Sequence, residues 1–162
     1  MQLYSKTIAS PVGALHLVAS DKGLRYIGFD GGRDRHPALE GDIVENKSHK
    51  LLLAAEKQLA EYFAGRRDRF DVPLELKGTV FQMNAWRALQ KIPYGHTRSY
   101  GEQAKMVGDA KKARAVGMAN NRNPICIIIP CHRVIGANGA LVGYGGGLKR
   151  KEQLLAIEKK SA

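Results

Sequence analysis

The chain has little cysteine, and this scarcity excludes several kinds of cross-linked or metal-bound protein. Cys126 and Cys131 are the only cysteines among 162 residues. They stand five positions apart in a strand-like stretch, too far to bridge in an extended chain, so we expect no structural disulfide. Their spacing also lacks the paired pattern of a zinc site, and we expect no metal ligands. Reduced thiols are typical of the cytosol.

Long hydrophobic runs are missing as well. No apolar run approaches the roughly 20 residues that a transmembrane helix needs. The N-terminus does not show the basic and then apolar pattern of a signal peptide. Hydrophobic content of 44% and charged content of 25% are ordinary for a globular domain. We therefore expect a cytoplasmic protein with no membrane partner.

Acidic residues are scarce in the second half of the chain. Residues 77 to 162 contain 15 Lys and Arg against 4 Asp and Glu, whereas residues 1 to 76 contain 11 of each kind. The whole formal charge of +11 therefore lies in the second half. A basic region attracts a polyanion, so this imbalance favours nucleic acid as a partner. A basic surface that only keeps copies of the protein apart is the alternative.

Residues 1 to 77 predict a small structural α/β lobe of three to four strands. The strand-like runs are residues 3–9, 14–19, 24–29 and 70–76. Residues 30 to 47 have no clear period and are predicted to be a loop. Apolar positions from Leu51 to Phe63 share one face of a predicted helix, with Ser48 as its cap and Gly65 after its end. This lobe carries no recognisable chemistry.

Residues 78 to 162 predict a mostly helical lobe. Thr79 with Gln82, and Ser99 with Glu102, have the spacing of capping boxes at two helix starts. The helix that begins after Ser99 runs to about Met106. Asp109 is placed to cap another helix over residues 110–120. Two short helices across a glycine-containing turn are the helix-turn-helix pattern, although any helical hairpin would also fit.

The predicted helix over residues 110–120 combines basic residues with small residues. Lys111, Lys112 and Arg114 alternate with small side chains that include Ala113 and Gly117. A helix that packs in a core would carry Leu and Ile instead, whereas small residues allow close approach to another surface. We interpret this helix as lying in a DNA groove, with Arg114 reaching into the duplex.

The stretch Ile125–Ile135 holds the most reactive group in the chain. Its β-branched residues predict a buried strand, which Pro130 ends or bends. Cys131 and His132 follow directly. Adjacent strand residues point to opposite faces, so a break at Pro130 and a bridging water are needed before the imidazole can act on the thiol. Without the neighbouring residues, Cys131 would be interpreted as a small buried hydrophobe.

Glycines surround the predicted reactive turn. The loop of residues 143–147 contains four glycines and Tyr144, and it lacks the Lys-Ser/Thr ending of a phosphate loop. Such a loop leaves space beside the thiol for a flat substrate. A final helix over residues 148–159 is predicted to bury Leu154 and Leu155 and to bring Glu158 inward.

Together these motifs resemble the O6-alkylguanine-DNA alkyltransferases, also called methylated-DNA–protein-cysteine methyltransferases. The resemblance covers the whole second lobe and extends more loosely to residues 1 to 76. The matching motifs are Ser99-Tyr100-Gly101, Ala113-Arg114-Ala115-Val116-Gly117, Asn123-Pro124, Pro130-Cys131-His132-Arg133-Val134, Gly143-Tyr144 and Glu158. Arg122 departs from the pattern, because a small residue usually precedes Asn-Pro, and one added phosphate contact is our hypothesis for it.

The resemblance implies a role for each site residue. Cys131 accepts the alkyl group, His132 deprotonates it through a water, and Glu158 orients the histidine. Asn123 braces the turn, and Tyr100 donates a proton to guanine N3. For DNA binding it implies Arg114 as a finger that replaces a flipped base, with contacts from Lys111, Lys112, Ala113, Gly117 and Arg122. For the base pocket it implies Val134, Tyr144 and Gly145.

The resemblance also implies how the protein works as a whole. It implies a monomer that repairs O6-alkylguanine, and O4-alkylthymine as well, in double-stranded DNA. It also implies that the protein needs no cofactor and is inactivated by one turnover. Two other functions remain open from the residues alone. A cysteine hydrolase could use Cys131, His132 and Asn123, although it would not need a basic helix. A non-enzymatic DNA-binding relative could share the fold, although there the nucleophile is typically replaced.

Overall fold

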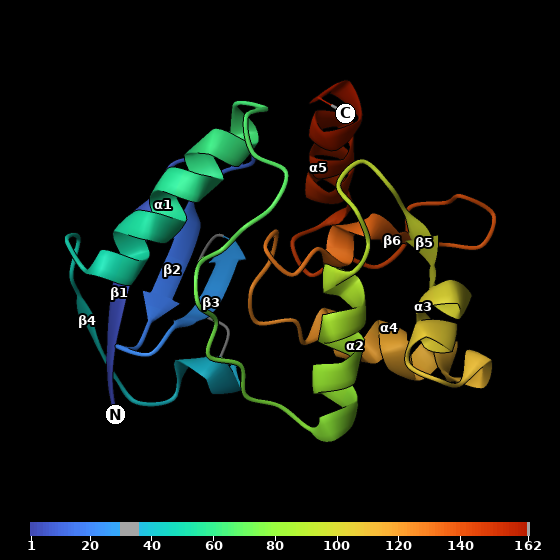
Figure 1. Cartoon of the computed structure of the whole chain (residues 1–162), viewed down its shortest axis with the longest axis horizontal. Helices are drawn as coiled ribbons and strands as arrows, with labels where there is room; N and C mark the ends of the chain where they lie inside the picture. The colour runs from blue at the N-terminus through green and yellow to red at the C-terminus, as the bar shows by residue number, and fades with distance from the viewer. Residues whose placement is uncertain (30–35, 162) are drawn as a thin grey trace. The chain divides into compact units, whose positions relative to one another are not determined.

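The computed structural model describes residues 1–29 and 36–161, which divide into two compact units (Figure 1). The division falls after Lys77. A short segment from the second half of the sequence, Pro124–Cys126, belongs to the N-terminal unit. None of the described helices is long and apolar enough to cross a membrane.

The N-terminal unit is built on a four-stranded sheet in the order β3-β2-β1-β4. Its strands are β1 (Gln2–Ile8), β2 (Leu15–Ala19), β3 (Leu24–Phe29) and β4 (Asp42–Glu45). The first three form an antiparallel meander, and β4 pairs in parallel with β1. The three predicted strands of the meander are confirmed with boundaries within about two residues, as is usual for assignments of element ends.

Helix α1 (Lys50–Phe63) covers one face of this sheet (Figure 1). It buries Leu52, Leu59 and Tyr62, which recur at the spacing of one helical face. Its cap is His49 rather than the predicted Ser48, and the cap makes no side-chain hydrogen bond. Gly65 follows the end of the helix with φ 76°, the left-handed conformation that glycine adopts most easily.

Two predictions for this unit are wrong in part. The predicted loop of residues 30–47 contains β4 and a short 3₁₀ turn, Pro37–Leu39, while residues 30–35 lie outside the described part. All four residues of β4 are exposed, so this edge strand has no hydrophobic alternation to reveal it. The predicted strand at 70–76 forms only an isolated bridge between Leu24 and Leu74, because Pro73 has no N–H to extend a ladder.

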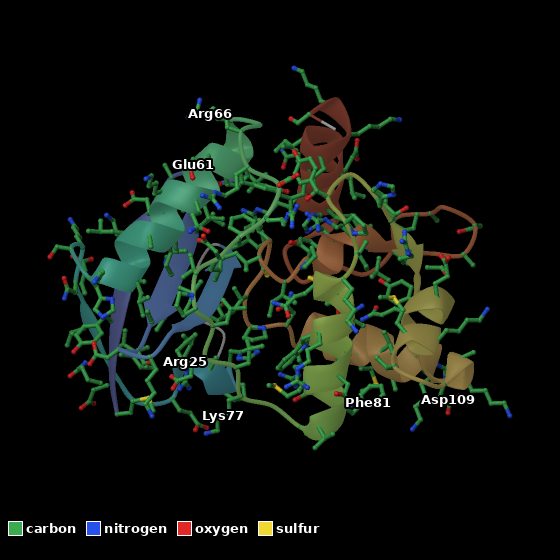
Figure 2. The ribbon with its side chains drawn as sticks, viewed as in Figure 1. Arg25, Glu61, Arg66, Lys77, Phe81 and Asp109 are labelled. Atoms are coloured by element: carbon green, nitrogen blue, oxygen red, sulfur yellow. The ribbon has the colours of Figure 1, made fainter. Side chains whose placement is uncertain are left out.

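The C-terminal unit is mostly helical, as predicted. Its helices are α2 (Val80–Gln90), α3 (Tyr100–Met106), α4 (Ala113–Asn121, preceded by the 3₁₀ turn Ala110–Lys112) and α5 (Leu148–Ser161). Both predicted capping boxes are present, at Thr79 for α2 and at Ser99 for α3. Asp109, in the turn between α3 and α4 (Figure 2), caps the 3₁₀ turn and not the predicted helix over residues 110–120, because α4 itself begins at Ala113.

Buried polar side chains fix the helix pair α3–α4 against α2. Gln103 and Asn120 exchange two side-chain hydrogen bonds of 2.9 and 2.8 Å. The Gln103 amide also donates to the Ala85 carbonyl of α2, and Trp86 Nε1 of α2 donates to the Ala119 carbonyl at 2.9 Å. Because all these groups are buried, losing one would leave its partner unsatisfied, and the helix pair is held in one arrangement.

The predicted strand beginning at Ile125 is wrong. Ile125 forms one isolated bridge with Ile27, and the chain then turns through Ile127, whose φ is 74°. A 3₁₀ turn, Cys131–Arg133, follows Pro130. A two-residue strand β6 (Val134–Ile135) then pairs with β5 (Arg98–Ser99). A run of isoleucines requires burial, and turns satisfy this requirement as well as a strand does.

Candidate active site and nucleic-acid interface

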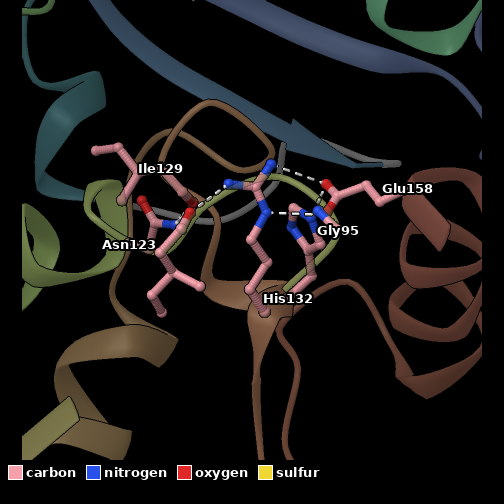
Figure 3. Close-up of polar contacts among 7 residues, drawn as sticks. Gly95, Asn123, Ile129, His132 and Glu158 are labelled. Carbon is pink, nitrogen blue, oxygen red and sulfur yellow. Dashed lines mark hydrogen bonds and ion pairs between the residues drawn. The ribbon is translucent and has the colours of Figure 1, made fainter. Parts of the chain in front are cut away.

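A buried charged cluster in the C-terminal unit consists of His132, Arg133 and Glu158. Figure 3 shows its polar contacts. His132 Nε2 is 2.6 Å from Glu158 Oε2. The Arg133 guanidinium donates to both carboxylate oxygens of Glu158, at 2.8 and 3.0 Å, and to the Ile92 carbonyl at 2.7 Å. Glu158 comes from α5 and both its partners from the Cys131–Arg133 turn, so the cluster joins the end of the chain to the predicted reactive turn.

Burial and charge set the protonation states of this cluster. Burial would raise the pKa of Glu158, but the hydrogen bonds and charges of His132 and Arg133 outweigh it and lower that pKa to about 2. Burial lowers the pKa of His132, against the opposing hydrogen bond and charge of Glu158. At neutral pH we therefore expect a carboxylate, a guanidinium and a neutral imidazole that donates its Nε2–H to Glu158.

This arrangement leaves the other imidazole nitrogen able to accept a proton. His132 Nδ1 is buried, and no side chain or backbone group of the described part hydrogen-bonds to it. In the tautomer that donates from Nε2, Nδ1 carries a lone pair. Glu158 thus fixes both the tautomer and the ring orientation, which is how a carboxylate assists a histidine base.

Cys131 lies in a turn that is braced at one carbonyl. Its side chain is a thiol with 6% of the residue surface exposed. The Ile129 carbonyl accepts hydrogen bonds from the Cys131 backbone N–H at 2.8 Å and from Asn123 Nδ2 at 2.7 Å. Figure 3 shows Asn123 beside Ile129. The amide of Asn123 thus holds the backbone that positions Cys131.

Tyr100 lies between α4 and the glycine loop. Its hydroxyl donates to the Val142 carbonyl at 3.0 Å, and a Cβ added to Gly117 would lie 3.6 Å from its ring. Burial raises the pKa of Tyr100, and the negative charge of Cys131 raises it further. The phenol therefore stays protonated at neutral pH and can act as a hydrogen-bond donor.

The predicted DNA-binding residues lie on α4, in the 3₁₀ turn before it and at its C-terminal cap. Four basic side chains are exposed: Lys111, Lys112, Arg114 and Arg122. Ala113 and Gly117 are half-buried, and Gly117 lies against Tyr100. Lys112 Nζ lies 5.7 Å from the centre of the ring of Phe81 on α2. Phe81 is labelled in Figure 2. The basic side chains are thus exposed from the turn before α4 to the residue after its end.

The three residues assigned to a base pocket differ in exposure. Val134 is buried, Tyr144 is half-buried and Gly145 is exposed. A Cβ added to Gly145 would meet nothing within 4 Å, so open space adjoins its backbone. The glycine loop therefore presents main chain rather than side chains at this position.

Sequence reasoning gave no role to two charged residues that the structure places at the site. Arg133 lies inside the recognised motif, and its contacts with Glu158 and Ile92 required the tertiary structure. Lys151 is fully buried on the same helix as Leu154 and Glu158. Spacings of three and seven place these three on one helical face, so the periodicity of α5 could have revealed Lys151.

Replacing Glu158 with glutamine should lower stability and change its pH dependence. The folded pKa of about 2 lies below the ordinary 4.5, so the stabilisation by the Glu158 carboxylate, through its ion pair with Arg133 and its hydrogen bond with His132, is present above pH 4.5 and is lost as the pH falls from 4.5 towards 2. We expect Glu158→Gln to lose about 3 kcal/mol of unfolding free energy at pH 7. Urea titrations at several pH values would measure this.

The exposed Glu152 of the same helix offers a matched control. Glu152→Gln should leave unfolding free energy within about 0.5 kcal/mol of the parent. If parent and Glu158→Gln lose stability equally steeply between pH 4.5 and the acid limit, the carboxylate of Glu158 is not the titrating group.

Both halves of the chain match models of a single protein family. Residues 80–160 match the DNA-binding domain of 6-O-methylguanine DNA methyltransferase. Residues 3–76 match the ribonuclease-like domain of the same enzyme. Among the described residues, no group of three or more His, Cys, Asp or Glu is placed to hold a metal ion.

Individual relatives agree over nearly the whole chain. A methylated-DNA–protein-cysteine methyltransferase from Methanosarcina acetivorans is 49% identical over 96% of this chain and 98% of its own. The crystal structure of Mycobacterium tuberculosis OGT in complex with DNA is 46% identical, with a TM-score of 0.88 over 100% of this chain and 95% of that chain. An O6-methylguanine DNA methyltransferase from Methanococcus jannaschii is 30% identical, with a TM-score of 0.68 over 95% and 93%.

Proposed function

The chain belongs to the 6-O-methylguanine DNA methyltransferase family, and on that premise we propose that it repairs DNA by transferring the alkyl group of O6-alkylguanine to its own Cys131. The observation that carries the choice of residue is the buried cluster at the thiol turn. Cys131 is followed by a neutral histidine whose partner carboxylate is fixed by an arginine. The same site would accept O4-alkylthymine.

The proposed chemistry begins with proton removal. A thiol has an ordinary pKa of about 8.5, so a base is needed to supply thiolate at neutral pH. His132 Nδ1 accepts the thiol proton through a bridging water, while Glu158 accepts the Nε2–H hydrogen bond and stabilises the imidazolium. Asn123 keeps the turn in place through the Ile129 carbonyl.

The thiolate then attacks the alkyl carbon. A sulfur–carbon bond forms as the carbon–O6 bond breaks, and the electron pair of that bond passes to the guanine. Tyr100 donates a proton or hydrogen bond to ring nitrogen N3, which offsets the charge on the leaving base. The exchange balances because a thioether replaces the thiol and guanine gains one proton from Tyr100. The His132 imidazolium then releases the thiol proton to solvent, and Tyr100 takes a proton back from solvent.

The substrate carbon lies on a base edge inside a duplex, so we propose that the base is flipped out before it reacts. Extrusion costs a few kcal/mol. In this proposal Arg114 enters the space left in the duplex. The other exposed basic side chains of α4 and its preceding turn bind phosphates. Val134, Tyr144 and Gly145 then border the extruded base.

The test of this function is a count of alkyl groups transferred. A thioether is a stable bond, and no described group is placed to reverse it, so we expect a plateau near one alkyl group per chain. Intact-mass measurement during titration with excess O6-methylguanine duplex would give the count. Sustained transfer well beyond one group per chain would contradict single turnover.

The position of the alkyl group needs a variant as well as a mass. Cys126 and Cys131 fall on one tryptic peptide, residues 123–133, so its mass alone does not distinguish them. We expect Cys126→Ser to reach the same plateau as the parent. Fragment ions should place the added mass on Cys131, and a plateau lost with Cys126 would assign the reaction to the other thiol.

A further inference from the structure

Lys151 is a buried cation without a carboxylate partner in the described part of the chain. The residue has 0% of its surface exposed and forms none of the ion pairs found among the described residues. Lysine is almost never fully buried unless it is paired, because removing an ammonium from water is costly. A buried lysine at a reactive site therefore requires an explanation.

Backbone carbonyls take the place of a carboxylate. Lys151 Nζ donates to the carbonyls of Val134 at 2.5 Å, Val142 at 2.8 Å and Gly143 at 3.4 Å. Val134 directly follows the Cys131–Arg133 turn, and its N–H donates to the Cys131 carbonyl. Val142 and Gly143 belong to the loop that adjoins Tyr100. One ammonium thus joins the reactive turn to the glycine loop.

The same ammonium lies beside Tyr100. Lys151 Nζ is 5.9 Å from the centre of the Tyr100 ring, and the Tyr100 hydroxyl shares the Val142 carbonyl with it. Lys151 and Tyr100 therefore hold the same peptide group from two directions. Lys151 of α5 therefore contacts three other parts of the unit: β6 directly after the thiol turn, the loop at Val142 and Gly143, and Tyr100 of α3.

We propose that Lys151 is a positioning residue that holds the reactive turn against the glycine loop and whose fixed charge stabilises the Cys131 thiolate. This inference rests on the proposed function, because it concerns the same thiol. Carbonyl oxygens do not neutralise a cation as a carboxylate does, so the ammonium keeps a net charge that can act on a neighbouring anion.

The charged groups around the thiol support this role. Tyr100 comes from α3, His132 and Arg133 from the reactive turn, and Lys151 and Glu158 from α5. Burial lowers the pKa of Lys151, and the negative charge of Cys131 acts in the opposite direction. The positive charge of Lys151 helps to lower the pKa of His132. Arg133 donates hydrogen bonds to the Glu158 carboxylate, whereas Lys151 donates its hydrogen bonds to backbone carbonyls.

The test compares variants that separate charge from packing. Lys151→Gln keeps N–H donors for the carbonyls but removes the charge, and Lys151→Arg keeps the charge but alters the packing. Lys149→Gln, at an exposed position of the same helix, controls for net charge. All are made in the Cys126→Ser background so that only Cys131 reports.

The readout is the pKa of Cys131, taken from the pH dependence of its alkylation by iodoacetamide, beside the rate of transfer from O6-methylguanine duplex. For Lys151→Gln we expect the Cys131 pKa to rise by about one unit and transfer at pH 7 to fall about tenfold. That loss should shrink at higher pH. Lys151→Arg and Lys149→Gln should keep a Cys131 pKa close to the parent's.

Each other outcome overturns the proposal in a defined way. A slower Lys151→Gln with an unchanged Cys131 pKa would leave only the packing role and refute the electrostatic one. If Lys151→Gln does not fold, an elevated Cys131 pKa in Lys151→Arg would refute the electrostatic role. Because iodoacetamide needs no DNA, the pKa result stands apart from the proposed function, which fails instead if the parent accepts no alkyl group.

Discussion

Cys131→Ala is expected to abolish alkyl transfer while leaving affinity for duplex DNA close to the parent's. The thiol forms the new bond, so its removal leaves no acceptor in the site. Cys131 is buried and carries no positive charge, whereas affinity for DNA comes mainly from exposed lysine and arginine side chains. Transfer is measured by intact mass, and affinity by fluorescence anisotropy with O6-methylguanine duplex at a fixed salt concentration.

The second cysteine supplies the matched control for this variant. Cys126→Ser keeps the parent's full transfer in our proposal. Transfer that persists in Cys131→Ala would refute the assignment of the acceptor. A large loss of DNA affinity in Cys131→Ala would mean that the turn, and not only the thiol, contributes to the DNA-binding surface.

Arg114→Ala is expected to reduce repair of duplex DNA much more than reaction with the modified base alone. An isolated O6-alkylated base needs no extrusion, so an arginine that fills the vacated space has nothing to offset there. Because extrusion costs a few kcal/mol, we expect duplex repair at saturating DNA to fall roughly 10- to 100-fold. Reaction with the isolated base should stay near the parent's rate.

Arg122 provides a second exposed arginine, at the end of α4, for comparison. If Arg122 binds a phosphate, Arg122→Ser should reduce the slope of log affinity against log salt by about one and leave transfer at saturating DNA unchanged. Equal losses for Arg114→Ala on duplex and isolated base would show that Arg114 supports the fold or the active site instead.

Local signals in the sequence predicted much of the helical unit. The capping boxes at Thr79 and Ser99 lie where predicted, because each depends on hydrogen bonds within one turn of chain. The family and fold class inferred from the Pro-Cys-His-Arg-Val motif and its companions are confirmed. The roles assigned to individual site residues stay predictions.

Long-range partners explain the failures. Strand β4 lacks a hydrophobic alternation and exists because β1 offers it an edge. Residues 125–130 have strand-like composition, yet they form turns, with one bridge to Ile27. In both cases the local pattern was compatible with more than one conformation, and distant segments selected one of them.

The sequence by itself determined the family and the starts of α2 and α3, since these depend on residue types and on short spacings. Only the tertiary structure decided which charges meet. Glu158 is 26 positions from His132 and 25 from Arg133, and Lys151 reaches carbonyls 17 and 9 positions away. A buried charge is stable only where the fold supplies its partners, and no local pattern specifies partners that far along the chain.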